Sequence, residues 1–142
     1  MSKIIIAGLL IFSSIASAKT SATLALNNLI KNGSYSGHSQ GLHCEVRVQT
    51  KQDLASVEII TSGQSEFFSL LDSSLSYHVD EKTGELSATM NLAFPHYING
   101  ATKLLSVRSV SANEVAVSIS MIALDHRGND MSTFSNCKIT TK

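Results

Sequence analysis

From Gly33 to the end of the chain, apolar and polar residues alternate with a period of two, and this pattern limits the fold more than any other feature of the sequence. Successive side chains of a β-strand point to opposite faces of the sheet, so alternation is typical of strands with one buried face. No segment after Gly33 carries a convincing helical pattern of ten residues, which argues against βαβ units and a parallel sheet. The pattern therefore predicts a mainly all-β, antiparallel domain.

Hairpin turns suit the connections between the strand-like segments. Between residues 79 and 86, Gly84 stands where a type I turn followed by a left-handed residue requires it. Residues 111–113 separate two further β-rich runs in the same way. We therefore expect a small antiparallel β-barrel or sandwich of about eight or nine strands. The expected strands are residues 34–39, 42–49, 57–61, 67–71, 75–79, 86–92, 103–107, 115–121 and 133–140.

One short N-terminal helix is expected in residues 19–31. Apolar residues recur there at helical spacing behind the possible N-caps Thr20 and Ser21, and Asn32 and Gly33 follow as an end signal. A helix this short is marginal alone and must pack on something. We expect it to plug or flank one end of the β-structure.

Residues 1–18 have the three parts of a secretory signal peptide. Lys3 supplies the basic start, an apolar run follows over 4–15, and small residues at 16–18 suit cleavage after Ala18. The apolar run is short for a membrane span, and no second run of spanning length follows. We therefore expect one exported domain, 19–142, in the periplasm or outside the cell, with no membrane span after cleavage.

The charge of the chain argues against binding to nucleic acid. The sequence has eleven basic and eleven acidic side chains, and cleavage after Ala18 would remove one basic residue and no acid. The mature domain would then have a net charge near −1, whereas nucleic-acid binders usually carry a basic excess.

Two cysteines, Cys44 and Cys137, lie in the expected mature domain. An exported chain passes through a compartment where thiols oxidise, so we expect one disulfide between them. Its geometry requires Cα atoms within about 7 Å, so the first long strand and the last must be neighbours or face each other.

Pro95 marks the one segment that is both aromatic and rich in turn residues. Proline cannot donate to a β-ladder, and Asn99-Gly100 is a strong turn signal, so 94–100 is predicted to be a loop. Phe94 and Tyr97 would then either complete the core beneath this loop or form a lip at a ligand entrance.

Gly37-His38-Ser39-Gln40-Gly41 matches G-x-S-x-G, the nucleophile elbow of α/β-hydrolases. That elbow requires a buried strand, a sharp turn and a helix, whereas an alternating strand follows here. A serine hydrolase using Ser39 therefore stays an alternative, and we assign no catalytic residue.

The sequence gives little support for a metal-binding site. His43 with Glu45, or His78 with Asp80, could supply two ligands each, but no H-x-x-x-H or clustered Cys/His pattern appears. We expect no metal and no cofactor.

The segment Gly33-Ser34-Tyr35-Ser36-Gly37, directly after the expected helix, resembles the calycin pattern, in which lipocalins and avidin-like proteins begin their barrel with G-x-W. Here Tyr35 stands in place of the tryptophan. The resemblance implies a closed antiparallel barrel with a cavity for a small molecule.

A non-enzymatic exported protein that binds a small apolar ligand or a partner macromolecule fits these observations best. Tyr35, Phe94 and Tyr97 are the candidate ligand-binding residues, and a purely structural envelope component is a further alternative. The interior is expected to be lined by Met90, Leu92, Val117, Ile119 and Met121, which alternate with polar residues.

Overall fold

The computed structural model describes residues 21–51, 54–70, 75–93 and 97–141. The expected signal peptide and Phe94 lie outside these residues. Within the described residues, one helix and nine strands follow one another: α1 (Ala22–Leu29), β1 (Gly33–Ser39), β2 (Leu42–Lys51), β3 (Leu54–Thr61), β4 (Gln64–Ser69), β5 (Ser76–Val79), β6 (Leu86–Leu92), β7 (Tyr97–Ser109), β8 (Glu114–Asp125) and β9 (Thr133–Thr140).

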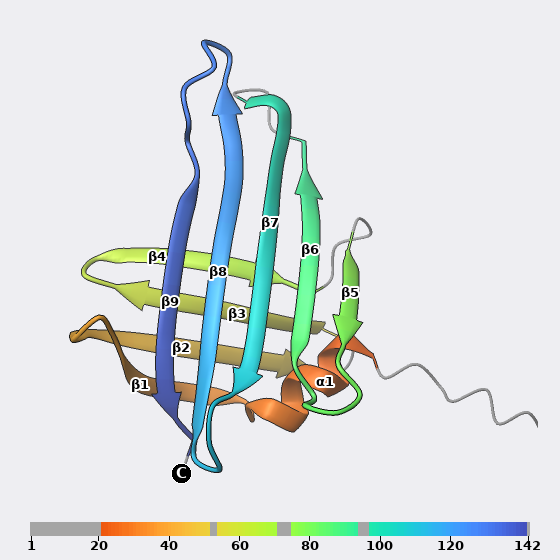
Figure 1. Ribbon diagram of the computed structural model, residues 1–142, viewed down its shortest axis with the longest axis vertical. Coiled ribbons are helices and arrows are strands. Elements are labelled where there is room, and N and C mark those ends of the chain that lie inside the picture. The colour runs from red at the N-terminus through yellow and green to blue at the C-terminus, as the bar shows by residue number, and fades with distance from the viewer. Residues whose placement is uncertain (1–20, 52–53, 71–74, 94–96, 142) are drawn as a thin grey trace, which may run out of the picture.

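The nine strands form one antiparallel sheet in the order β4-β3-β2-β1-β9-β8-β7-β6-β5. This sheet curls into a half-barrel, with β4 and β5 at its two ends. In Figure 1, β6 to β9 run along the long axis and β1 to β4 pass behind them crosswise. The fold is therefore mainly all-β, as the alternation predicts, and its two layers are halves of one sheet.

The two layers join where β1 meets β9. This pairing comprises Gly37 opposite Ile139 and His38 opposite Lys138. Glycine is required at this joint because a Cβ atom on Gly37 would lie 2.2 Å from the carbonyl oxygen of Lys138. Such a distance is far inside van der Waals contact, so any side chain would push β1 and β9 apart.

A disulfide between Cys44 and Cys137 makes a second connection between the layers. It joins β2 to β9 across the core, with the two Cα atoms 5.9 Å apart and both side chains buried. The predicted pairing is confirmed, and so is its consequence that the first long strand and the last face each other.

The space between the layers is filled by the apolar side of the alternating strands. Val46, Ile119 and Phe68 are fully buried there, and the buried side chains of the described residues include no polar or charged group. Full burial of one such large side chain contributes about 1.5–3 kcal/mol. Leu42 departs from the predicted pattern. It is two positions before the buried Cys44 in β2 and so belongs to the same alternating set, but it begins the strand at a hairpin and stays 64% exposed.

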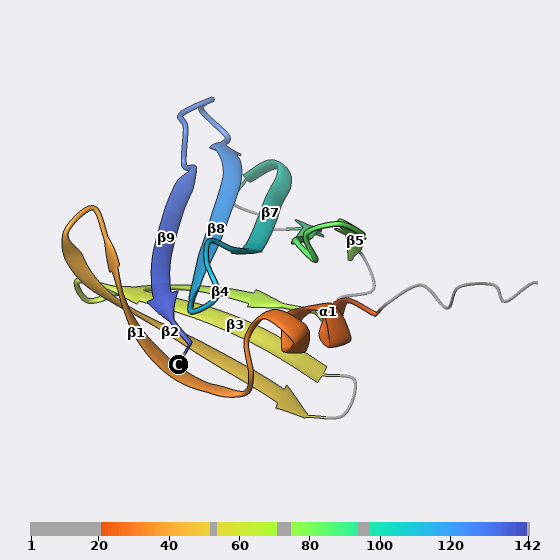
Figure 2. The same ribbon diagram turned by 60° about the horizontal axis from the view of Figure 1, so that its bottom comes forward.

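Helix α1 flanks one end of this core, as expected. The Ser21 side chain accepts a hydrogen bond from the backbone N–H of Leu24 and caps the helix, while Leu26 and Ile30 are buried. The helix contacts β5, β6 and β7, and its place beside β5 is visible in Figure 2. The hydroxyl of Thr50 donates to Oδ1 of Asn27 at 3.0 Å and ties the helix to β2.

The predicted loop over 94–100 is wrong for the part that the structure describes. Residues 97–100 belong to β7, and the pairing with β8 shifts register between Tyr97 and Ala101. Gly100 has a φ of +75°. A Cβ atom there would lie 2.1 Å from the carbonyl oxygen of Leu92. A left-handed glycine serves a β-bulge as well as a turn, so Asn99-Gly100 interrupts the ladder without reversing the chain.

Candidate functional site

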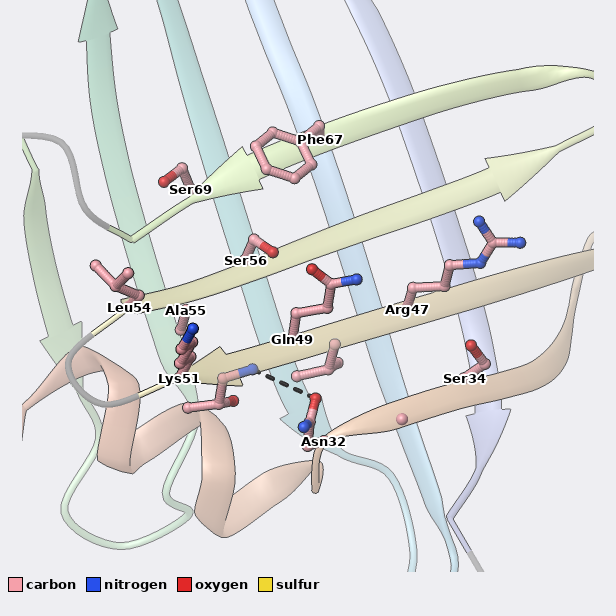
Figure 3. A pocket seen from close by; sticks show the side chains of 13 residues that line it. Asn32, Ser34, Arg47, Gln49, Lys51, Leu54, Ala55, Ser56, Phe67 and Ser69 are labelled. Atoms are coloured by element: carbon pink, nitrogen blue, oxygen red, sulfur yellow. Dashed lines mark hydrogen bonds between the residues drawn. The ribbon is translucent and has the colours of Figure 1, made fainter.

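A groove of about 730 Å³ lies on the outward face of the β1–β4 layer, the face turned away from β6–β9. Figure 3 shows its lining side chains from close by. We call it the β1–β4 groove. Its volume falls in the range of small-molecule sites, which is about 300–1,000 Å³.

Strand register places the lining residues in rows across the layer. Arg47 of β2 lies opposite Ser34 of β1 and Glu58 of β3, and Glu58 lies opposite Phe67 of β4. Neighbouring side chains in such a row have Cβ atoms about 4.5–5.5 Å apart, so they contact one another. Ser34, Arg47 and Phe67 of this row line one side of the groove, and Glu58 stands outside the lining.

The next row is polar and neutral. It runs from Gln49 through Ser56 to Ser69, and beyond it Lys51 lies opposite Leu54. Figure 3 shows the amide of Gln49 and the hydroxyl of Ser56 beside the ring of Phe67. The groove therefore offers amide and hydroxyl groups next to an aromatic face.

Two large apolar side chains of the groove remain open to solvent. Phe67 is 49% exposed and Leu54 is 43% exposed. An apolar surface with a few fixed polar groups is the usual composition of a ligand site, where burial supplies affinity and hydrogen bonds supply orientation.

The guanidinium of Arg47 is held by two carboxylates on the same face. Its Nε donates to Oε1 of Glu45 at 2.8 Å, and its Nη1 lies 4.0 Å from Oε2 of Glu58. The hydrogen bond and charge of Glu45, with a smaller effect of Glu58, raise the pKa of Arg47. These acids balance the positive charge of Arg47, so this guanidinium acts in the groove as an oriented donor rather than as a free cation.

One end of the groove is closed by the segment that follows α1. The backbone N–H of Thr50 donates to Oδ1 of Asn32 at 3.3 Å, drawn as a dashed line in Figure 3. This bond ties the beginning of β1 to the end of β2 at the rim of the groove.

The predicted ligand residues are not gathered at this groove. Tyr35 is half-buried against the core, and its hydroxyl donates to the carbonyl oxygen of Lys31 at 2.7 Å. Tyr97 starts β7 opposite Asp125, at the end of the long strands that lies away from α1 (Figure 1). Phe94 lies outside the described residues.

The expected interior residues line a packed core. Met90, Val117 and Ile119 are buried, and Leu92 and Met121 are half-buried. Sequence reasoning missed Phe67 and Leu54. The signal was Phe67-Phe68 within β4, since adjacent strand residues face opposite ways and one of the two aromatic rings had to point outward.

The G-x-S-x-G motif lies in a β-hairpin rather than in a strand, turn and helix. Gly37 to Ser39 end β1, Gln40 and Gly41 form the turn with φ values of +49° and +79°, and β2 follows. These angles are those of a two-residue type I′ hairpin turn. The hydroxyl of Ser39 donates to Oδ1 of Asn136 in β9.

Within residues 21–51, 54–70, 75–93 and 97–141, no three His, Cys, Asp or Glu side chains gather in a way that could hold a metal ion. In the same residues no helix has the length and apolar character needed to cross a bilayer. Comparison of the chain with protein-family models, curated sequences and solved structures finds no match.

Proposed function

We propose that this protein is an exported, non-catalytic binding protein that holds a small, largely apolar ligand without net charge in the β1–β4 groove. One observation carries the proposal: Phe67 and Leu54 lie exposed in a groove of ligand size. The amide and hydroxyl row beside them provides hydrogen bonds to a ligand with few polar groups.

Export is supported by the disulfide and by the start of the sequence. The Cys44–Cys137 bond persists in oxidising compartments and is rare in the cytosol. Residues 1–18 carry the basic, apolar and small-residue parts of a secretory signal.

A site on the outward face is favoured over one between the layers. The inner side chains are buried against one another, and a ligand there would have to displace packed residues such as Phe68 and Ile119. On the outward face, a ligand would cover apolar surface that is open already.

Binding rather than turnover is favoured by the chemistry of the lining. The described residues that line the groove include no His, Cys, Asp or Glu, so the serine hydroxyls of the lining have no imidazole or carboxylate among the lining residues to activate them as nucleophiles. The charge of Arg47 is balanced by Glu45 and Glu58, and Lys51 lies at the end of the groove opposite Leu54. The middle of the groove, between Gln49 and Phe67, therefore favours a neutral group over an anion.

The test is a titration with N-phenyl-1-naphthylamine, a neutral apolar fluorophore. We expect saturable fluorescence enhancement with the wild type and about tenfold weaker binding by Phe67→Ala. The reason is that the ligand would cover the exposed half of the Phe67 side chain, and the variant lacks this apolar contact. Leu24→Ala is the control, because Leu24 of α1 is a 53% exposed apolar side chain that does not line the groove. Absence of saturable binding, or equal weakening by both variants, would overturn the proposal.

The hydrolase alternative has its own discriminating measurement. If the wild type hydrolyses p-nitrophenyl esters and Ser39→Ala does not, Ser39 is a nucleophile and the protein is an enzyme. We expect equal background hydrolysis by both proteins, because the Ser39 hydroxyl is committed to Asn136 and lies in a hairpin.

A further inference from the structure

A second cleft lies on the outward face of the other layer. It has a volume of about 430 Å³ and extends over β7, β8 and β9 to the end of β1. We call it the β7–β9 cleft. It shares no lining residue with the β1–β4 groove, and it is independent of the proposed function.

Two cations flank a small residue in this cleft. Arg108 of β7 lies opposite Ala116 of β8, which lies opposite Lys138 of β9. Neighbouring strands are about 4.8 Å apart, so the two long side chains start about 10 Å apart with only a methyl group between them. An anionic group fits above Ala116, within reach of both. His38 of β1 lies opposite Lys138 and completes the row.

The neighbouring row adds neutral hydrogen-bonding groups. Ser106, Ser118 and Asn136 lie opposite one another on β7, β8 and β9. The Ser39 hydroxyl donates to Oδ1 of Asn136 and thereby fixes the amide. The amide NH₂ group is left as a donor beside the two cations.

The charge of the lining selects an anion. The described residues that line the cleft include no carboxylate, and no described carboxylate lies within 4.0 Å of the charged nitrogen atoms of Arg108 or Lys138. Two acids lie near its edge: Glu85 accepts from the Ser106 hydroxyl at 3.3 Å, and Glu114 precedes Ala116 by two positions on β8. Both stand outside the lining, whereas Arg108 and Lys138 are the direct cross-strand neighbours of Ala116.

An apolar surface continues from the cationic end. Lys138, Asn136 and Phe134 alternate along the outward face of β9, so the aromatic ring follows the ammonium group at a spacing of about 7 Å per step. Phe134 also borders a smaller cleft of about 210 Å³ that it shares with Leu42. Phe134 and Leu42, 67% and 64% exposed, have the highest exposures of any large apolar side chains in the described part of the chain.

We infer that the β7–β9 cleft binds a soluble single-chain anionic amphiphile, with its head group between Arg108 and Lys138 and its apolar chain over Phe134 and Leu42. Charge complementarity fixes the head, and the aromatic surface next to it fixes the direction of the chain. A neutral molecule would leave the cations without a partner, and a small inorganic anion would leave the apolar surface bare.

The probe is decanoate, kept below its micelle concentration and titrated into the purified protein by calorimetry. We expect 1:1 binding that weakens at least about tenfold in the double variant Arg108→Gln/Lys138→Gln, because charge-assisted hydrogen bonds are lost. Phe134→Ala should weaken it similarly. Leu24→Ala is the control, because Leu24 of α1 is a 53% exposed apolar side chain that lines neither the groove nor the cleft, and it should bind decanoate as the wild type does.

Two further titrations complete the design. The alcohol 1-decanol has the same chain without the charge and should bind at least tenfold more weakly than decanoate. Vesicles of an anionic phospholipid test the membrane as the source of the anion.

Four results would overturn the inference: no decanoate binding, equal binding of 1-decanol, unchanged binding by the double variant, or binding to vesicles without binding to decanoate. Failure of the proposed function would show separately, as loss of the Phe67-dependent signal with the neutral fluorophore.

Discussion

Reduction of the Cys44–Cys137 disulfide should bring this domain close to unfolding. The two cysteines are 93 positions apart in the sequence, so the bond closes a long loop that contains β3 to β8. In the loop-entropy treatment, a cross-link that closes a loop of this length raises the free energy of the unfolded chain by about 4.6 kcal/mol at 25 °C. Small domains have a free energy of unfolding of about 5–15 kcal/mol in total.

The measurement is urea unfolding followed by far-UV circular dichroism, with and without a thiol reductant. We expect the free energy of unfolding to fall by about 2–5 kcal/mol on reduction, the range found for native disulfides. Reduced wild type is the appropriate comparison, because both sulfur atoms keep their place in the core.

The variant Cys44→Ala/Cys137→Ala serves as the control. It should be no more stable than the reduced wild type, because it also leaves space in the core. It should not respond to the reductant. A loss below about 1 kcal/mol on reduction would refute the reasoning, because the cross-link would then not restrict the unfolded chain as its loop length requires.

Three further outcomes are expected from substitutions and pH. Gly37→Ala should destabilise the fold by about 1–3 kcal/mol in urea unfolding, because its methyl group would overlap the backbone of β9. Phe68→Ala should cost about 3–5 kcal/mol and Phe67→Ala less than about 1 kcal/mol, since the first ring is buried and the second half exposed; equal losses would contradict the assigned faces. The backbone N–H groups of Thr83 and Lys82 donate hydrogen bonds to the Asp80 carboxylate and lower its pKa. The stability that this carboxylate contributes is therefore fully present above its ordinary pKa near 3.9, and it is lost as the pH falls through the lower pKa of the folded state. Asp80→Asn should therefore flatten the loss of stability seen in acid unfolding below about pH 4, and an unchanged acid profile would contradict this cause.

Local pattern was sufficient for the parts of the fold that depend on neighbouring residues. The predicted strands 86–92 and 133–140 coincide with β6 and β9, and Gly84 adopts the predicted left-handed conformation with a φ of +73°. Ser21 caps α1 as expected. These features follow from side-chain alternation, from turn geometry and from an N-terminal cap, all of which act within a few residues.

Features decided by distant segments were not predictable in the same way. The Asn99-Gly100 signal fits a turn or a bulge, and the pairing of β7 with β8 decides between them. Leu42 alternates in step with the core residues of β2, but it starts the strand at a hairpin and stays exposed.

Prediction of the candidate site depended on distant contacts more strongly than prediction of the fold did. Alternation indicated that Phe67 and Phe68 face opposite sides, but only the strand order places Phe67 near Arg47 and Gln49 in one groove. The β7–β9 cleft likewise needs β7, β8 and β9 in register, which no local pattern of Arg108 or Lys138 reveals.

The joint between β1 and β9 also determines when the domain can be completed. β1 lies next to β2 in the sequence, but its other edge waits for residues 138 and 139, near the end of the chain. As the polypeptide emerges with its N-terminus first, β1–β4 and β5–β8 can form as separate meanders, each through contacts of short sequence separation. The late arrival of β9 gives this topology a high contact order, which slows folding. Until then β1 has an unpaired edge, which is a hazard for association with other chains.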